Sequence, residues 1–211
     1  MSDYIDAPYT LKSEAEQIAR KAKLCEPHVK TLAEYVERIR DQKLGEVPDF
    51  DPLDGGGNAE VLFLLEKPGP MADSSGFISR NNPDPTAKAI FEFQTQIGLP
   101  RKKTCLWNYM PYWNGTRKTT KAEREIGEGL LQGLIPLLRN LKVVVLVGSK
   151  AQRAEKFFES LNKNRPPNMQ IGIEISSHPS PIVKATNLEK WYQIPQEWKN
   201  VFKYIGKSEH G

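Results

Sequence analysis

Four short apolar runs mark the chain, at residues 61–65, 104–107, 143–147 and 170–176. Continuous apolar runs of this length are typical of strands that are buried on both faces, as in parallel sheets. Between them, apolar residues recur at helical spacing over about 84–98, 120–139 and 151–162. Strands that alternate with helices predict a three-layer α/β/α sandwich around a four-stranded parallel sheet, joined by right-handed crossovers.

The regions outside these runs predict further helices and two loops. Residues 11–43 show helical spacing that Pro27 divides into two helices, and 187–207 is mostly helical. The Gly- and Pro-rich stretches 48–58 and 68–85 predict loops. A length of 211 residues fits one domain. We therefore expect a single domain with an N-terminal helical pair (1–45), a core (59–185) and a C-terminal helical segment (186–211).

Composition indicates a globular protein and limits the partners and cofactors that it could have. A hydrophobic fraction of 38% and a charged fraction of 27% fit a globular chain, and the net charge of +4 permits a polyanionic partner. No secretion signal or membrane-spanning run is visible, so a cytoplasmic monomer is expected, with no membrane partner. Two cysteines and three histidines predict no metal, iron–sulfur cluster or other cofactor.

Polar residues follow the first and last apolar runs, where parallel sheets commonly bind ligands. Glu66 and Lys67 come directly after the first run. His178 follows the last one, in Ser177-His178-Pro179-Ser180-Pro181, where the prolines stiffen the turn. This turn predicts that the backbone amides of His178 and Ser180 are free to meet a ligand.

Two further residues suit a flat, polar ligand. Asn108 closes the second run, and its side-chain amide places a donor beside an acceptor, as a pyrimidine edge requires. Phe77 stands in the predicted loop after the first run and could stack on a ring or anchor the loop in the core. Each residue alone has an ordinary structural explanation, since asparagine also forms turns.

Together these segments resemble the uracil-DNA glycosylase superfamily over roughly residues 60–185. The matching parts are Leu65-Glu66-Lys67-Pro68-Gly69, Phe77, Asn108 and His178-Pro179-Ser180-Pro181-Ile182, in the family's order. The resemblance implies an enzyme that flips a base out of DNA and hydrolyses its N-glycosidic bond to leave an abasic site. It also implies the superfamily's fold, with duplex DNA, or else single-stranded DNA, as partner.

The resemblance assigns a role to each matched position. His178 would stabilise the departing base anion at O2, Asn108 would read the base edge, and Phe77 would stack on its face. Ile182 would wedge into the space that the flipped base leaves. Phosphate contacts are expected from the following residues: Ser177, Ser180, Arg117, Lys118 and Lys121, together with the basic run 101–103.

The first motif departs from the family pattern at Leu65, where glycine is usual, and at Lys67, where several families carry Asp or Asn. Glu66 matches a glutamate of a branch whose iron–sulfur cluster two cysteines cannot hold. Lys67 could contact a phosphate while Glu66, Asp73 or Asp84 serves the water, which we favour. It could instead be an amine nucleophile or contact an unusual group on the base.

Gly69 stands where uracil-strict members carry a tyrosine that blocks substituents at C5 of the pyrimidine. The absence of that tyrosine, with Lys67 close by, predicts uracil or a 5-modified pyrimidine as substrate, such as a phage-type modified cytosine. The corresponding role would be in repair or in phage defence. The alternative is a non-catalytic nucleic-acid-binding protein on the same scaffold. A nucleotide-binding module or small-molecule hydrolase is disfavoured, because no Gly-rich phosphate loop or Gly-x-Ser-x-Gly elbow is present.

Overall fold

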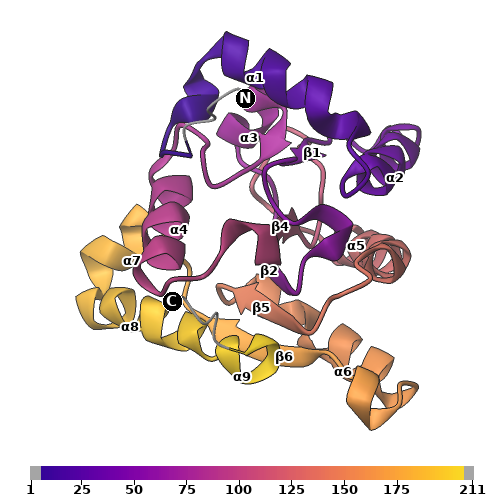
Figure 1. Cartoon of the computed structure of the whole chain (residues 1–211), viewed down its shortest axis with the longest axis vertical. Helices are drawn as coiled ribbons and strands as arrows, with labels where there is room; N and C mark the ends of the chain where they lie inside the picture. The colour runs from indigo at the N-terminus through magenta and orange to yellow at the C-terminus, as the bar shows by residue number, and fades with distance from the viewer. Residues whose placement is uncertain (1–5, 207–211) are drawn as a thin grey trace.

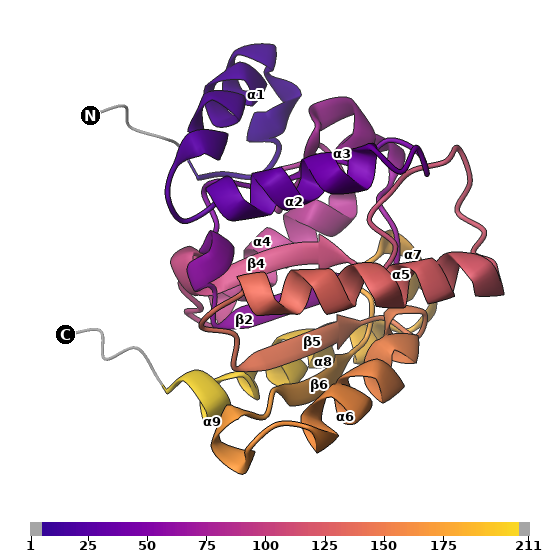
Figure 2. The same ribbon diagram turned by 90° about the vertical axis from the view of Figure 1, so that its right-hand side faces the viewer.

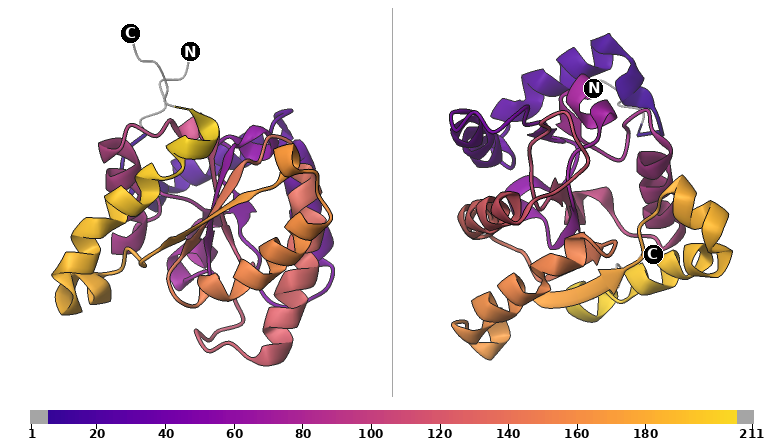
Figure 3. Two further views of the ribbon diagram at one scale, coloured as in Figure 1. Left: turned by 90° about the horizontal axis from the view of Figure 1, so that it is seen from below. Right: turned by 180° about the vertical axis from the view of Figure 1, so that it is seen from behind.

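A computed structural model describes residues 6–206 as three layers around a parallel sheet (Figures 1 and 3). The sheet has the strand order β4-β2-β5-β6. Its strands are β2 (Val61–Leu65), β4 (Thr104–Asn108), β5 (Val143–Val147) and β6 (Gly172–Ser176). All neighbours pair in parallel, so the predicted fold class and all four predicted strands are confirmed.

The two central strands are buried because helices cover both faces of the sheet. β5 is buried along its whole length, and β2 is buried except at Leu65. One face is covered by α4 (Pro85–Gln96) and α8 (Leu188–Lys199), the other by α5 (Lys121–Leu134) and α6 (Glu155–Lys163), as Figure 3 shows from below. Short helices α7 (Pro181–Thr186) and α9 (Phe202–Ile205) flank α8. Helical spacing over 120–139 would place Ile126 of α5 inward with Leu130 and Leu134, but Ile126 is 37% exposed, so that part of the prediction is wrong.

Local sequence signals define where these helices begin. Asp84 caps α4 by accepting a hydrogen bond from the amide of Ala87 at 2.9 Å. Thr120 and Glu123 form a reciprocal capping box at the start of α5. The N-terminal pair divides near Pro27 as predicted, into α1 (Glu14–Lys21) and α2 (Lys30–Arg40).

The two predicted loops contain short elements that the sequence pattern does not reveal. Residues 68–85 include α3 (Pro70–Ser75) and β3 (Phe77–Ile78), and residues 48–58 include β1 (Asp49–Phe50). β1 and β3 pair in parallel as a separate two-stranded sheet. Segments this short carry too few residues to show a periodic pattern.

Candidate active site

Four strand ends bring the predicted site residues to one edge of the sheet. Leu65 of β2 pairs with Asn108 of β4, and Val147 of β5 pairs with Ser176 of β6. In Figure 2 the arrowheads of β4 and β5 point toward the side where the segment before α5 lies. Because all strands are parallel, the residues that follow them meet at this edge, as the sequence predicts.

His178 is held firmly at the end of β6. Gly148 lies against its side chain, and a Cβ placed on Gly148 would come within 2.9 Å of the His178 Cβ. Gly148 also has φ of +86°, which suits glycine alone among common residues. The amide of Ser177 donates to Glu197 at 2.9 Å and fixes the preceding residue. The imidazole therefore has a fixed position before any ligand binds.

The same ring is free to interact through its nitrogens. Within residues 6–206 its nitrogens make no hydrogen bond, and the side chain is half-buried. Burial lowers the pKa of His178, and the nearby Lys150 and Arg117 act in the same direction, while Glu66 opposes them. A lowered pKa keeps the imidazole neutral at pH 7, so that one ring nitrogen donates and the other accepts.

Glu66 is the carboxylate closest to the end of the central strand. Its Oε1 accepts from the Thr119 hydroxyl at 2.6 Å, and its Oε2 lies 2.9 Å from the Lys150 ammonium. The side chain is 17% exposed, and its charge acts on His178. The carboxylate is thus oriented by two partners. Lys150 was not predicted, although its place three residues after β5 put it at this edge.

Asn108 ends β4 with an unpaired polar atom. The residue is 3% exposed, and its Oδ1 has no hydrogen-bond partner in the described structure. An unpaired buried acceptor costs about 1–3 kcal/mol. A ligand that donates to this oxygen would recover that free energy, as expected of a residue that reads a base edge.

A family comparison agrees with this geometry. Residues 53–199 match the family model described as the uracil DNA glycosylase superfamily, which is well over half of the 211-residue chain. The chain belongs to the uracil-DNA glycosylase superfamily. No individual curated protein matches it. Membership supports a DNA glycosylase type of function, with DNA as the substrate.

Against the glycosylase pattern, Lys67 has a position that the sequence did not suggest. Its side chain is 3% exposed, and its Nζ donates to Asn114 Oδ1 at 2.6 Å and pairs with Glu123 Oε1 at 3.2 Å. The favoured contact with a DNA phosphate does not occur in this conformation, because the ammonium is turned into the protein.

The two base-pocket residues of the glycosylase motif differ in their surroundings. A Cβ built on Gly69 has no heavy atom within 4 Å, so no other side chain stands directly beside position 69 in place of the family's tyrosine. Phe77 is 0% exposed and pairs through β3 with Asp49 of β1. In this conformation no face of its ring is open to solvent, so the structure does not present Phe77 as a stacking surface.

The candidate DNA contacts after β6 differ in how accessible they are. Ile182 is 72% exposed in the first turn of α7. The Ser180 hydroxyl accepts from the amide of Val183, and the Ser180 amide donates to the His178 carbonyl at 2.8 Å. The prediction of a free amide at Ser180 is therefore wrong, because the tight turn uses it internally.

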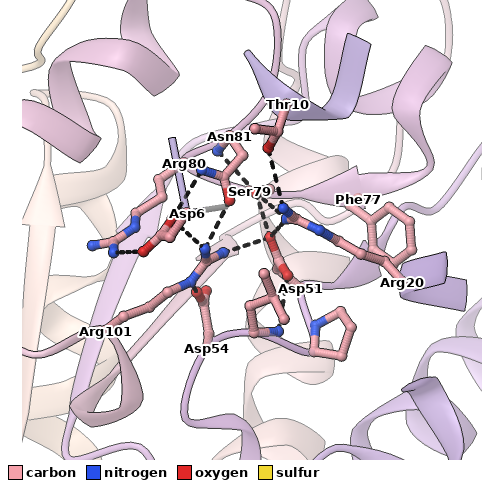
Figure 4. Close-up of polar contacts among 12 residues, drawn as sticks. Asp6, Thr10, Arg20, Asp51, Asp54, Phe77, Ser79, Arg80, Asn81 and Arg101 are labelled. Carbon is pink, nitrogen blue, oxygen red and sulfur yellow. Dashed lines mark hydrogen bonds and ion pairs between the residues drawn. The ribbon is translucent and has the colours of Figure 1, made fainter. Parts of the chain in front are cut away.

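The basic candidates divide between two edges of the sheet. Arg117 and Lys118 are exposed in the segment before α5, and the charge of Arg117 acts on both His178 and Asp84. Residues 101–103 instead precede β4, at the other end of that strand. Arg101 is buried among aspartates (Figure 4). The prediction that 101–103 contacts the same DNA as His178 is therefore wrong.

The remaining carboxylates suggested for the water lie in other settings. Asp84 is occupied in capping α4, and burial raises its pKa. Asp73 lines a groove with Lys21, Arg40 and Asp49, beside the N-terminal helices. Glu66 is therefore the suggested carboxylate whose charge acts on His178. Within residues 6–206 no cluster of three or more His, Cys, Asp or Glu side chains could hold a metal ion, and no helix could cross a bilayer.

Proposed function

We propose that this chain is a DNA glycosylase that flips out a pyrimidine and hydrolyses its N-glycosidic bond, leaving an abasic site. The observation that carries the proposal is a pair of residues at one sheet edge. His178 has a fixed, neutral ring with free nitrogens, and Asn108 has a buried oxygen without a partner. Neither group has a hydrogen-bond partner within the described protein, and a flipped base could supply one to each.

The proposed reaction uses three of these residues. The bond between C1′ and the base nitrogen breaks, its electron pair leaves with the base, and positive charge develops on the sugar. His178 donates a hydrogen bond to O2 of the departing anion, which is worth about 2.7–4 kcal/mol for a single oriented donor. Asn108 pairs with the base edge. Glu66 orients a water, which adds its oxygen to C1′ and gives up a proton to the carboxylate.

The substrate range follows from Gly69. We expect uracil to be a substrate, and because a Cβ on Gly69 meets no atom within 4 Å, we also expect a substituent at C5 of the pyrimidine to be tolerated. A modified cytosine of the kind found in phage DNA would fit a role in phage defence, and uracil would fit repair.

A panel of duplex and single-stranded oligonucleotides tests this proposal. It contains uracil, thymine mispairs, hydroxymethylcytosine and glucosylated cytosine, and cleavage at alkali-sensitive abasic sites is scored. Release of at least one base by the wild-type chain supports the glycosylase. If no base in a broad panel is released while DNA is bound, the non-catalytic binder is supported instead.

Gly69→Tyr tests the substrate range separately. The ring would fill the open space, so release of 5-substituted bases should fall while uracil release is retained. Gly69→Ala is the matched control, since a single methyl group meets no atom within 4 Å. If wild type and Gly69→Tyr share one substrate profile, position 69 does not select the substituent.

A further inference from the structure

Lys67 is bound to the segment before α5, which contacts the candidate active-site edge. The site loop, defined here as residues 113–120, connects Tyr112 to α5. Lys67 Nζ contacts Asn114 in this loop at 2.6 Å and Glu123 just beyond it at 3.2 Å. The ammonium also lies 5.6 Å from the centre of the Tyr112 ring, within reach of a cation–π interaction. The buried ammonium of Lys67 thus contacts one residue within the loop and one residue on either side of it.

The acceptor side of this arrangement is fixed as well. Glu123 Oε2 accepts from the Thr120 amide at 2.7 Å, and its Oε1 accepts from Asn114 Nδ2 at 2.8 Å. Burial alone would raise the pKa of Glu123, but the Thr120 amide and the Lys67 ammonium outweigh it and lower the pKa to about 2. Glu123 is therefore ionised at every pH at which the enzyme would work, and it holds Lys67 as an ion pair.

The loop carries its own contacts to the catalytic edge. The Thr119 hydroxyl donates to Glu66 at 2.6 Å, and the charge of Arg117 acts on His178. Glu66 and Lys67 are neighbours in sequence, so two adjacent side chains bind one loop. Lys67 contacts the site loop near both of its ends, at Asn114 and at Glu123 just beyond it. Glu66 accepts a hydrogen bond from the Thr119 hydroxyl within the loop.

We infer that Lys67 is a positioning residue, the latch that holds the site loop over the active site and thereby orients Glu66 through Thr119. The inference rests on the proposed function, since it assigns the water to Glu66. It replaces each role suggested for Lys67 from sequence. A phosphate or base contact would need an accessible ammonium, and a nucleophile would need a free amine, whereas this group is 3% exposed and paired with Glu123.

Two substitutions separate a latch from a nucleophile. Lys67→Arg keeps a cation that can pair with Asn114 and Glu123 but has no primary amine. Lys67→Met keeps the length of the side chain and loses the charge. Lys88→Met is the matched control, because Lys88 forms an exposed pair with Glu92 on α4. Amide hydrogen exchange of residues 113–120 and steady-state excision rates are measured for all four proteins.

The latch gives a distinct pattern of results. Lys67→Met should speed exchange across 113–120 and lower kcat by up to about 100-fold, the scale expected when a catalytic group is misplaced, with a smaller change in KM. Lys67→Arg should restore slow exchange and most of kcat, and Lys88→Met should match wild type. Borohydride should trap no adduct between wild type and DNA.

Other outcomes overturn the inference. Unchanged exchange in Lys67→Met would show that Lys67 does not hold the loop. An adduct trapped by borohydride in wild type and lost in Lys67→Arg would make Lys67 a nucleophile. Amide hydrogen exchange is measured without substrate. A wild-type chain that releases no base would therefore contradict the proposed function, while the exchange data would still test whether Lys67 holds the loop.

Discussion

Two polar clusters at opposite ends of the sheet differ in how completely their hydrogen-bonding groups are paired. The arginine–aspartate cluster consists of Arg20, Asp51, Asp54 and Arg101 and lies near the start of β4 (Figure 4). Its side chains are 0–9% exposed, and each guanidinium nitrogen has a partner. At the candidate active-site edge His178 is half-buried and Asn108 is buried, and the His178 ring and the Asn108 oxygen are unpaired. Saturation of hydrogen bonds, more than residue type, separates the structural cluster from the candidate site.

The largest effect is expected where the saturated cluster loses a charge. Arg101→Met leaves Asp51 and Asp54 with too few partners in a buried setting, so the free energy of unfolding should fall by about 3–5 kcal/mol. Urea denaturation measures it. The exposed control Lys163→Met should stay within about 0.5 kcal/mol of wild type. Equal stability of both variants would show that the cluster is not what holds this end of the fold.

The catalytic edge should respond in rate and not mainly in stability. Gly148→Ala places a methyl group within 2.9 Å of the His178 Cβ and strains a positive φ, so the imidazole must shift. We expect base excision to fall by up to about 100-fold, measured in single-turnover assays. Gly129→Ala, with open space around its Cβ in α5, should leave the rate unchanged and stabilise by about 1 kcal/mol. Full activity of Gly148→Ala would remove the need for a fixed His178.

A smaller effect tests the electrostatic link between Glu66 and His178. The Glu66 charge opposes the lowering of the His178 pKa by burial, so Glu66→Gln should lower that pKa further. NMR titration of the histidine ring protons measures the shift. His28 serves as the internal reference. A His178 pKa that rises or stays constant would mean that the carboxylate does not act on the ring.

The smallest effect concerns the pH dependence of stability at the opposite cluster. Burial raises the pKa of Asp54 to about 6 from the model-compound value of 3.8. The folded state therefore binds the proton more tightly, and the contribution of Asp54 to stability rises as pH falls from 7.5 through about 6 toward 4. Asp54→Asn removes this contribution. The unfolding free energy of wild type minus that of Asp54→Asn should therefore rise as pH falls from 7.5 to 4. A constant difference across this range would contradict the raised pKa of Asp54.

The sheet, and the edge of it that carries the candidate active site, were largely predictable from sequence. Buried runs of five apolar residues have few alternatives to a parallel strand, and a parallel sheet necessarily brings its strand ends together. That rule predicts Glu66, Asn108 and His178 at one edge of the sheet, and the structure has the strand ends that carry them at one edge. The same rule applies to Lys150, which follows the third apolar run, 143–147, by three residues.

The sequence could not reveal pairings between distant charged residues. Lys67 and Glu123 are 56 residues apart, and Arg101 and Asp51 are 50 apart. A basic run such as 101–103 looks the same in sequence whether it faces solvent or a buried carboxylate. For Phe77 the sequence left a stacking surface and a core anchor open. The structure shows a buried residue, because its two-residue strand is defined only by pairing with β1.

The most direct test of the account compares excision and binding in His178→Ala. Single-turnover release of the best base in the oligonucleotide panel is measured together with DNA affinity and urea stability. We expect the rate of base release to fall by about 10²–10³-fold, with DNA affinity and the free energy of unfolding close to the wild-type values. Release at the wild-type rate would contradict the assignment of this edge as the active site.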